Sequence, residues 1–426
     1  MTKYNDDKAW RQKFTENEYW MTSEDEPDDP TTEEQVKVEI GVQKTYQKFL
    51  RDKKELKVQR GKHIAYLLDG IRHLDSYFDS LDASRPWLVY WIVHSLDLLG
   101  ELDKHPDIIH DAVVFLSKCQ NSTGGFGGGP GQLSHLAPTY AAVNALAICG
   151  TQEAYEMIDR KGLHSFLMSM RDPIHGGFVM HHGGENDVRG CYCALNAASL
   201  AGVLTPELTA GIPEFIARCQ TYEGGMGGFP GNEAHGGYTF CALAAFLLSS
   251  PASHQLLNVP ALTDWAVARQ TPYEGGFNGR TNKLVDACYS FWMGGVFPLL
   301  HAMEYGWRFD AFWNQEKPAY NKSTKEEKGS DDMDSLYLFH QKNLQLYILI
   351  CSQDDVRGGF RDKPGKGRDF YHTCYTLSGL SVSQHNPDGT TSVVGPNENL
   401  MEPTHPIHNV RPIKATRMKN FFSEIK

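Results

Sequence analysis

The chain has 426 residues, 41% of them hydrophobic, which is enough to bury a large core as one repeat-built domain or as two ordinary domains. Its formal net charge is -11, but residues 1–36 hold eleven acidic and four basic side chains, so the remainder is nearly neutral and lacks the basic footprint of a nucleic-acid-binding protein. No apolar run reaches the roughly 18 residues of a membrane-spanning helix and the nine cysteines include no C-x-x-C pair, so we expect a globular protein with free thiols in a reducing, cytoplasmic setting.

The N-terminal segment is the most acidic part of the chain. Residues 23–34 read SEDEPDDPTTEE, a composition that offers too little apolar surface to offset the entropy lost on ordering. We therefore expect residues 1–36 to be a disordered acidic tail and residues 37–426 to form a single domain.

Apolar residues recur at helical spacing along the following chain. Residues 64–99 predict one divergent helical hairpin. Three later stretches show the i, i+3, i+4, i+7 spacing of a helix with one buried face. These stretches contain Ile109, Ala112, Val113 and Leu116; Leu163, Phe166, Leu167 and Met170; and Ile212, Phe215, Ile216 and Cys219.

Five Gly-Gly pairs follow stretches of this kind, and they divide the chain into an internal repeat. They begin at Gly124, Gly176, Gly224, Gly275 and Gly358, in steps of 52, 48, 51 and 83 residues. Periods of this size are typical of stacked or closed arrays of helical hairpins. With the divergent hairpin the count is about six, arranged either as a two-layer ring around a cavity or as an open solenoid. Residues 314–334, inside the long step, are highly charged and predict a loop insertion.

The polar residues that follow each glycine pair differ from repeat to repeat. Eleven residues after the first glycine stand His135, Asp187, His235, Asp286 and Asp369. Thirteen or fourteen residues after it stand, among others, Arg189, Tyr238, Cys288, Tyr289, Tyr371 and His372. Helix capping explains some of the aspartates but, on sequence grounds, not the histidines, the arginine or the cysteine. We therefore expect these positions to converge on a functional site.

Asp286, Cys288 and His372 are the candidate metal ligands. A carboxylate, a thiolate and an imidazole suit zinc, and three protein ligands leave one position open, as in catalytic sites. Asp286 and Cys288 are two residues apart and would not face each other on a regular helix, so they must precede the helix.

Two further groups of side chains surround these positions. His235, Arg280, Lys283 and Tyr289 could form a cradle for a pyrophosphate, although the two cations could equally be solvated loop charges. Aromatic side chains at inner-helix positions could wall a long hydrocarbon or be ordinary core. They are Trp87, Trp91, Tyr192, Tyr238, Trp292, Tyr371 and Tyr375.

Several long motifs resemble the β subunits of protein farnesyltransferases, within the protein prenyltransferase β-subunit family. They are DASRPWLVYW, GGFGGGPGQLSHLAPTYAAVNAL, GGMGGFPGNEAHGGYTFCALAA, GGFNGRTNKLVDACYSFW and DKPGKGRDFYHTCYTLSGLS. The resemblance runs from about residue 60 to about residue 410. It implies an all-α fold, an α-α barrel (α/α toroid). It also implies transfer of farnesyl from farnesyl diphosphate to the cysteine of a C-terminal CaaX motif through a zinc-bound thiolate.

The resemblance further assigns roles, residue by residue. It implies one zinc ion on Asp286, Cys288 and His372, and magnesium with the diphosphate near Asp362. Farnesyl diphosphate would contact His235, Arg280, Lys283, Tyr289, Tyr192, Tyr238, Trp292, Asp362 and Tyr375. The peptide would contact Trp87, Trp91, Arg189 and Tyr371. A separate α subunit would complete a heterodimer.

Three other functions are the alternatives. The type I geranylgeranyltransferase β subunit generally has smaller or different residues where this chain has Trp87, Trp91 and Tyr371, and typically has a lysine at the position of Asp362, so farnesyl is favoured. A terpene cyclase would need an acidic DxDD motif, which we do not find facing the cavity. A non-catalytic helical scaffold would contain no stoichiometric zinc.

Overall fold

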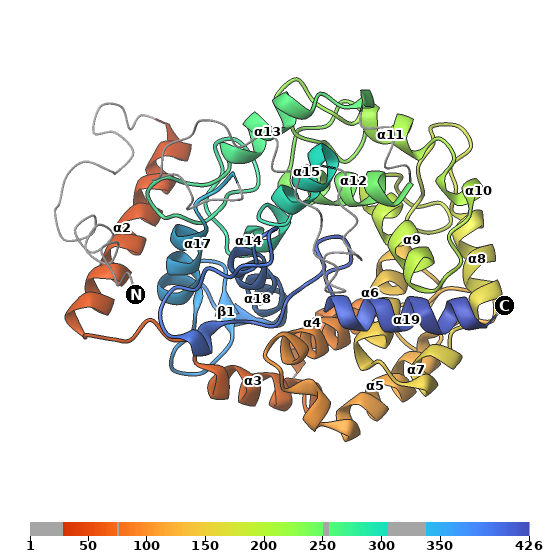
Figure 1. Cartoon of the computed structure of the whole chain (residues 1–426), viewed down its shortest axis with the longest axis horizontal. Helices are drawn as coiled ribbons and strands as arrows, with labels where there is room; N and C mark the ends of the chain where they lie inside the picture. The colour runs from red at the N-terminus through yellow and green to blue at the C-terminus, as the bar shows by residue number, and fades with distance from the viewer. Residues whose placement is uncertain (1–28, 75, 250–254, 306–337, 426) are drawn as a thin grey trace.

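A closed ring of inner helices forms the centre of the protein. The structure, a computed structural model, describes residues 29–74, 76–249, 255–305 and 338–425. Each inner helix packs against the next, and the last packs against both α14 and α4, which closes the ring (Figure 1). The members are α4 (Arg85–Leu98), α6 (Leu136–Cys149), α9 (Val188–Leu200), α12 (Gly236–Ser249), α14 (Tyr289–Trp292) with α15 (Val296–Tyr305), and α18 (Phe370–Gln384).

Each inner helix has an outer partner, which gives six hairpins in the described part of the chain. The outer helices are α3 (Arg60–Arg72), α5 (Pro106–Cys119), α8 (Arg160–Ser169), α11 (Ile212–Arg218), α13 (Val259–Val267) and α17 (Gln341–Tyr347). Short helices α7 (Gln152–Glu156) and α10 (Pro206–Thr209) lie in connections. The predicted α-α barrel is thus confirmed, and the open solenoid is not adopted.

The sequence pattern explains the two layers. The three apolar sets at helical spacing lie on α5, α8 and α11 or directly after them, and all their members are buried, because each outer helix turns one face toward the inner layer. Inner helices are enclosed on more sides. In α6, for example, Ala141, Ala142 and Ala145 are fully buried, and their small side chains let neighbouring helices approach closely.

One backbone hydrogen bond recurs at five junctions of the ring. At the start of an inner helix, an amide donates to the carbonyl that stands four residues after the first glycine of the next pair along the ring. The bonds run from Arg85 to Gly128, Leu136 to Met180, Val188 to Gly228, Gly236 to Gly279 and Ala287 to Asp362, with lengths of 2.8 or 2.9 Å. The glycine-rich loops therefore hold the N-terminal ends of the inner helices in a fixed circle.

The ring seam joins the first and last hairpins through long-range contacts. The amide of Gly359 donates to Nδ1 of His63 at 2.8 Å, and the ring of Tyr66 stacks on Phe370 with centroids 4.6 Å apart. Two short antiparallel strands, β1 (Phe360–Arg361) and β2 (Arg368–Asp369), form a hairpin that leads into α18, with Phe360 opposite Asp369.

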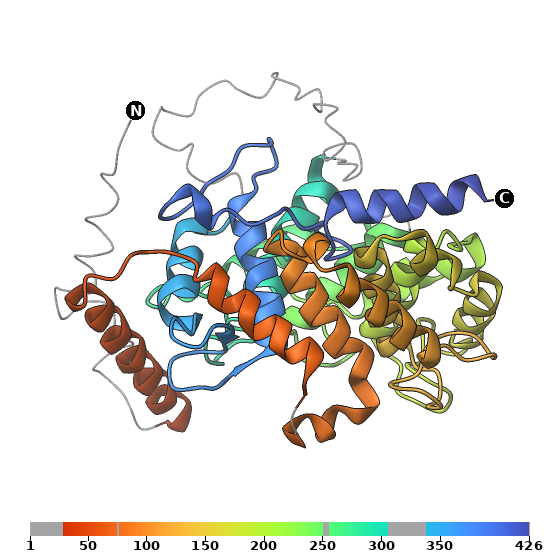
Figure 2. The same cartoon turned by 90° about the horizontal axis from the view of Figure 1, so that it is seen from below.

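A C-terminal segment, residues 404–410, lies across the other end of the ring and is called the plug below. Tyr90 and Tyr192 donate their hydroxyls to the carbonyls of Asn409 and Ile407, at 2.8 and 2.6 Å, and Asn144 donates to the carbonyl of His408 at 2.9 Å. After this segment, α19 (Pro412–Glu424) packs on α6 and α9 and runs along the upper edge of the molecule in Figure 2.

The predicted boundary of the acidic tail is wrong. Helix α2 (Pro30–Arg51) begins inside it, with Asp29 as its N-cap, proline in the first turn and Glu33 near the positive end of the helix dipole. The side chains of Val42 and Tyr46 are buried against Tyr273 and its neighbours. This burial of apolar surface stabilises the helix and offsets the entropy lost on ordering it. Figures 1 and 2 show α2 outside the ring.

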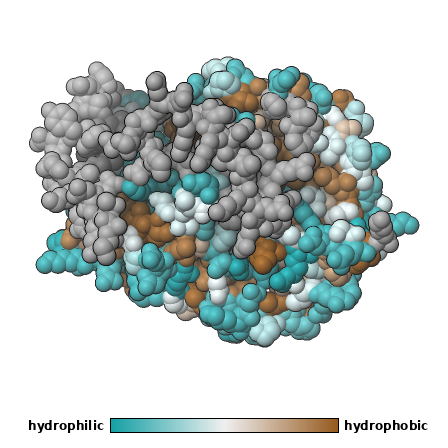
Figure 3. All heavy atoms as spheres, in the orientation of Figure 1, coloured by the Kyte–Doolittle hydropathy of each residue, from teal (hydrophilic) through white to brown (hydrophobic). Residues whose placement is uncertain are grey.

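Two predicted segments fall outside the described residues: positions 1–28 of the tail and the insertion at 314–334. Among the helices that the structure does describe, none combines the length and hydrophobicity needed to cross a bilayer. In the space-filling view, hydrophilic and hydrophobic residues are interspersed over the visible coloured surface (Figure 3).

Candidate active site

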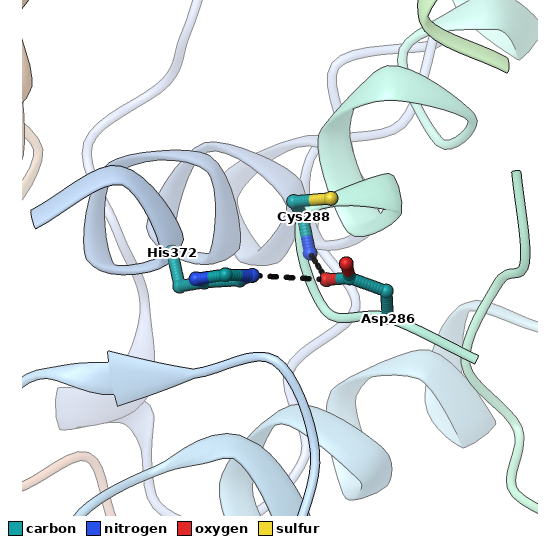
Figure 4. Close-up of side chains that lie close together, drawn as sticks. All are labelled: Asp286, Cys288 and His372. Atoms are coloured by element: carbon teal, nitrogen blue, oxygen red, sulfur yellow. Dashed lines mark hydrogen bonds and ion pairs between the residues drawn. The ribbon is translucent and has the colours of Figure 1, made fainter. Parts of the chain in front are cut away.

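Asp286, Cys288 and His372 meet at the N-terminal ends of α14 and α18 (Figure 4). Their potential ligand atoms all lie within 4.8 Å of one another, and no other such group of metal-binding side chains occurs in the described ranges. Asp286 and Cys288 precede α14, as their spacing requires. The amide of Ala287 between them is held by the carbonyl of Asp362 at 2.9 Å.

The imidazole of His372 lies between two carboxylates. Its Nδ1 is 2.6 Å from Oδ2 of Asp369 and its Nε2 is 3.2 Å from Oδ1 of Asp286. Asp369 also caps α18 by accepting the amide of His372 at 2.7 Å. Asp369 therefore orients the ring so that Nε2 faces Asp286 and Cys288, the arrangement by which a carboxylate commonly supports a metal-ligating histidine.

Burial and hydrogen bonding shift the pKa values of all three candidate ligands. Burial would lower the pKa of His372, but the hydrogen bonds to Asp286 and Asp369 raise it to about 10. Burial would raise the pKa of Asp286, but the hydrogen bond from His372 holds it at about 2. Burial, and then the charge of Asp286, raises the pKa of Cys288 well above its usual value. A sulfur, a nitrogen and an oxygen donor thus converge in a buried site that would give up two protons to a divalent cation, which fits zinc.

The five residues that stand eleven positions after each first glycine share one structural role, the capping of an inner helix at its start. Each accepts a backbone amide at the start of its inner helix. The lengths are 3.0 Å for His135 and His235 through Nδ1, and 2.8, 2.9 and 2.7 Å for Asp187, Asp286 and Asp369 through Oδ1. The interpretation that capping could not explain the histidines is therefore wrong, because an unprotonated imidazole nitrogen accepts an amide as a carboxylate does.

Capping decides which nitrogen of His235 carries the proton. Since Nδ1 accepts the amide of Gly237, the proton of the neutral ring is on Nε2, which lies 2.9 Å from the hydroxyl of Tyr289. Burial, and then the charge of Arg280, lowers the pKa of His235 and keeps the ring neutral. The Tyr289 oxygen can accept from His235 and keep its own proton for a ligand.

The two cations that were expected to bind a pyrophosphate, Arg280 and Lys283, differ in their surroundings. Arg280 is half-buried, and its guanidinium forms a 2.6 Å ion pair with Glu233 from the preceding glycine-rich loop. Lys283 is exposed on the same loop. Gly279 allows Tyr289 to lie against this loop, because a Cβ at that position would stand 2.0 Å from the Tyr289 ring.

Asp362 adds a second carboxylate beside the three candidate ligands. It occupies the junction position held by Gly128, Met180, Gly228 and Gly279 in the other repeats. Burial, and then the charge of Asp286, raises the pKa of its side chain. The ammonium group of Lys363 contacts both of its carboxylate oxygens.

Six of the seven predicted aromatic residues, all except Tyr238, belong to a closed belt of rings around the inside of the barrel. Contacting centroids are 4.5 to 5.7 Å apart along the whole circuit. The circuit passes through Trp87, Tyr140, Tyr192, Phe240, Trp292, Tyr375, Tyr371 and Trp91. Trp292 also donates from Nε1 to the Tyr371 hydroxyl at 3.1 Å. Tyr192 and Tyr375 are fully buried in the belt, whereas both tryptophans of α4 are half-buried.

Tyr238 and Arg189 lie near the N-terminal ends of α12 and α9. The guanidinium of Arg189 is 5.8 Å from the centre of the Tyr238 ring and is held by Asp187, with Nη2 2.6 Å from Oδ2. This hydrogen bond to Asp187 raises the pKa of Arg189. Arg189 therefore keeps its charge at the rim of the barrel.

Sequence reasoning did not name Tyr140, Phe240 or Lys363 as site residues, and it placed Asp369 among the converging positions without giving it a role. For two of them a signal was present. Tyr140, Tyr192 and Phe240 each stand 16 residues after the first glycine of their repeat, so alignment of the repeats could have found the missing rings. Asp369 stood in the capping position, but its second bond, to the His372 ring, depends on a side-chain geometry that spacing does not specify.

Comparison with known proteins agrees with this architecture. Residues 58–410 match the family model described as the prenyltransferase alpha-alpha toroid domain. The chain is 44% identical to the protein farnesyltransferase subunit beta of Arabidopsis thaliana over 83% of this chain and 80% of that one. It is 27% identical to the geranylgeranyl transferase type-1 subunit beta of the same plant, over 76% and 84%.

A solved structure, that of Candida albicans protein geranylgeranyltransferase-I complexed with GGPP, has a chain that aligns with this one with a TM-score of 0.64. The alignment covers 87% of this chain and all of that chain, at 22% sequence identity. At this identity the likeness supports the fold.

Proposed function

The chain belongs to the prenyltransferase family of α-α toroids, among the β subunits of protein farnesyltransferases, and from this we propose the chemistry of its site. It is a protein prenyltransferase. We propose that it transfers farnesyl from farnesyl diphosphate to the cysteine of a C-terminal CaaX motif. Farnesyl is favoured over geranylgeranyl because the identity to the farnesyltransferase subunit is 44%, against 27% for the geranylgeranyl transferase subunit.

Asp286, Cys288 and His372 would hold one zinc ion. Zinc bound there would lower the pKa of an incoming cysteine thiol, so that its sulfur is a thiolate at neutral pH. Asp369 would hold the His372 ring in place through Nδ1, at 2.6 Å. The substrate sulfur would then attack C1 of the farnesyl chain while the bond from C1 to the diphosphate oxygen breaks.

The residues of the glycine-rich rim would stabilise the departing diphosphate. Tyr289 is positioned to donate its hydroxyl proton, because His235 Nε2–H can satisfy its oxygen from the other side at 2.9 Å. Arg280 would exchange its ion pair with Glu233 for the more highly charged phosphate oxygens, and Lys283 would approach from solvent. Magnesium would accompany the diphosphate at Asp362, a half-buried carboxylate that already pairs with a cation.

The belt of aromatic rings would receive the hydrocarbon. Tyr192, Tyr238, Trp292 and Tyr375 would line the isoprenoid, while Trp87, Trp91, Tyr371 and Arg189 would contact the peptide. The plug at residues 404–410 lies across the far end of the barrel. An isoprenoid that enters from the N-terminal ends of the inner helices would therefore be stopped by the plug. Its position would limit the length of isoprenoid that fits.

The proposed assembly is a heterodimer with a separate α subunit, as the "subunit beta" relatives suggest. The proposed setting is the cytoplasm, where reducing conditions suit nine free, buried cysteines.

The observation that carries the proposal is the convergence of Asp286, Cys288 and His372 from two hairpins onto one potential metal position. The test is to purify the chain with and without a co-expressed α subunit, measure zinc stoichiometry, and assay farnesyl transfer to a peptide that ends in CaaX. We expect one zinc per β subunit and transfer that requires the α subunit. A metal-free protein, or transfer that proceeds equally well with the metal stripped, would contradict the proposal.

A further inference from the structure

Lys363 is a buried lysine that the proposed chemistry does not use. Only 8% of the residue is exposed, and its ammonium group contacts both carboxylate oxygens of the adjacent Asp362. Lysines are rarely this buried unless they are paired, because the charge loses its hydration. The charged groups around Asp362 explain why a lysine is buried beside it.

The surroundings of Asp362 are negative. Its carbonyl accepts the amide of Ala287, which fixes its backbone next to Asp286 and Cys288. The charge of Asp286 is felt at Asp362, where it raises the pKa together with burial, and Lys363 opposes both effects. The buried ammonium group of Lys363 therefore contacts both oxygens of a carboxylate that lies among other acidic side chains.

We propose that Lys363 is an internal cation that holds the metal-binding face of Asp362 until magnesium arrives with the diphosphate, and so sets the magnesium requirement of the enzyme. The inference rests on the proposed function, in which Asp362 receives that magnesium. No other residue of the described chain is hydrogen-bonded to the Asp362 carboxylate.

The physical reason is competition for the same oxygens. Magnesium binds carboxylate oxygens at short range in a strict octahedron, so it cannot share an oxygen face that is already covered by an ammonium group. The lysine must move before the metal can bind, and its positive charge also repels the metal. Both effects raise the metal concentration needed, and both disappear when Lys363 becomes neutral.

The test measures metal binding directly. The complex would contain the zinc-loaded heterodimer, farnesyl diphosphate and a CaaX-type peptide with serine in place of the acceptor cysteine, so that no transfer occurs. Binding of Mn²⁺, used as a paramagnetic substitute for magnesium, would be followed by the loss of the free-ion EPR signal. We expect Lys363→Gln and Lys363→Met to lower the half-saturating Mn²⁺ concentration roughly tenfold, the size of one charge-assisted hydrogen bond.

Two variants serve as controls. Lys363→Arg keeps the positive charge and should stay within about twofold of the wild type, since a guanidinium still binds both carboxylate oxygens. Lys366→Gln removes an exposed lysine from the same loop and should leave metal binding unchanged, because it lacks the contact with Asp362. Thermal melting and zinc content would show that each variant is folded.

A measurement on the unaltered protein makes the test independent of variant folding. Acetylation of Lys363 by acetic anhydride, read by mass spectrometry, should rise several-fold when Mn²⁺ is added to the complex, because the displaced amine is exposed. Unchanged metal affinity in both neutral variants overturns the inference. So does weaker diphosphate binding with unchanged metal affinity, which would make Lys363 a phosphate ligand. If the wild-type complex itself binds no Mn²⁺ and no farnesyl diphosphate, the proposed function fails instead.

Discussion

Nε2 of His372 lies 3.2 Å from Oδ1 of Asp286, although the two residues are 86 positions apart in sequence. The contact bridges the junction between α14 and α18, and it places an imidazole beside the Asp286–Cys288 segment. Closure of the helical ring makes this contact possible, because it holds the N-terminal ends of both helices in one circle.

Cys288→Ala should remove most of the bound zinc and most of the turnover, because the thiolate is the strongest zinc donor of the three. Zinc content of the purified heterodimer is the measurement. Cys193→Ala is the matched control, since this cysteine is also buried in an inner-helix hairpin but is not among the three candidate ligands. Normal zinc content in Cys288→Ala would refute the ligand assignment.

Zinc uptake should release about two protons near neutral pH, one from His372 and one from Cys288. Both groups are protonated in the metal-free site, because the pKa of His372 is raised to about 10 and that of Cys288 is raised well above its usual value. Zinc affinity should therefore fall as pH falls. A pH-indicator titration in weak buffer counts the protons, and His372→Ala should release one fewer. If the wild type releases no protons, His372 and Cys288 are already deprotonated before zinc binds.

Asp369→Asn should weaken zinc binding by roughly 10- to 100-fold while α18 remains capped, because the amide oxygen can still accept a backbone N–H but holds the His372 ring less strongly. Competition with a zinc chelator measures the effect. Asp187→Asn is the control, since Asp187 caps α9 in the equivalent position and has no contact with the metal group. Equal affinities of the two variants would assign Asp369 a capping role alone.

Tyr289→Phe should lower kcat about a hundredfold, the usual cost of losing one donor to a developing negative charge, with a smaller change in KM. The only hydrogen bond that the structure gives this hydroxyl is with His235, so the loss of thermal stability should be small. Single-turnover kinetics separates the chemical step from binding. An unchanged rate of that step would show that the hydroxyl does not reach the diphosphate.

Trp87→Thr should shift preference toward geranylgeranyl diphosphate by about tenfold, because removal of a ring from the aromatic belt makes room for a longer chain. Trp87 contacts Tyr140 with centroids 5.4 Å apart, so the space opens inside the belt. A competition assay with both diphosphates measures the ratio, and Trp87→Phe, which keeps an aromatic ring, should retain the farnesyl preference. Unchanged selectivity in Trp87→Thr would show that this position does not determine the preferred isoprenoid length.

Sequence periodicity predicted most of the fold because each hairpin repeats the same local signals. The apolar spacing located α5, α8 and α11, and the five glycine pairs gave the order of the hairpins. The same repeat predicted that Asp286 and His372 would be neighbours, since equivalent positions of adjacent repeats lie side by side. The metal role of these residues stays a prediction.

The missed features depend on contacts that no local pattern contains. Helix α2 is stabilised by Val42 and Tyr46 against Tyr273, more than 200 residues away, so composition alone placed its first turns in a disordered tail. The plug at residues 404–410 has no helical periodicity by which it could be predicted. Its position depends on hydrogen bonds from Tyr90, Asn144 and Tyr192, on three different helices, to its carbonyls. The pairing of Lys363 with Asp362 depends on burial, which the adjacent sequence letters do not reveal.

A closed circle of hairpins has no end repeat. Each inner helix has two neighbours, and the seam is also hydrogen-bonded, there from the Gly359 amide to the ring nitrogen Nδ1 of His63. Loss of any one hairpin would therefore open two joints at once, and no terminal unit is free to fray as it could in a linear array. Circular permutants with new termini in different glycine-rich loops should accordingly share one cooperative melting transition, wherever the chain is made to begin.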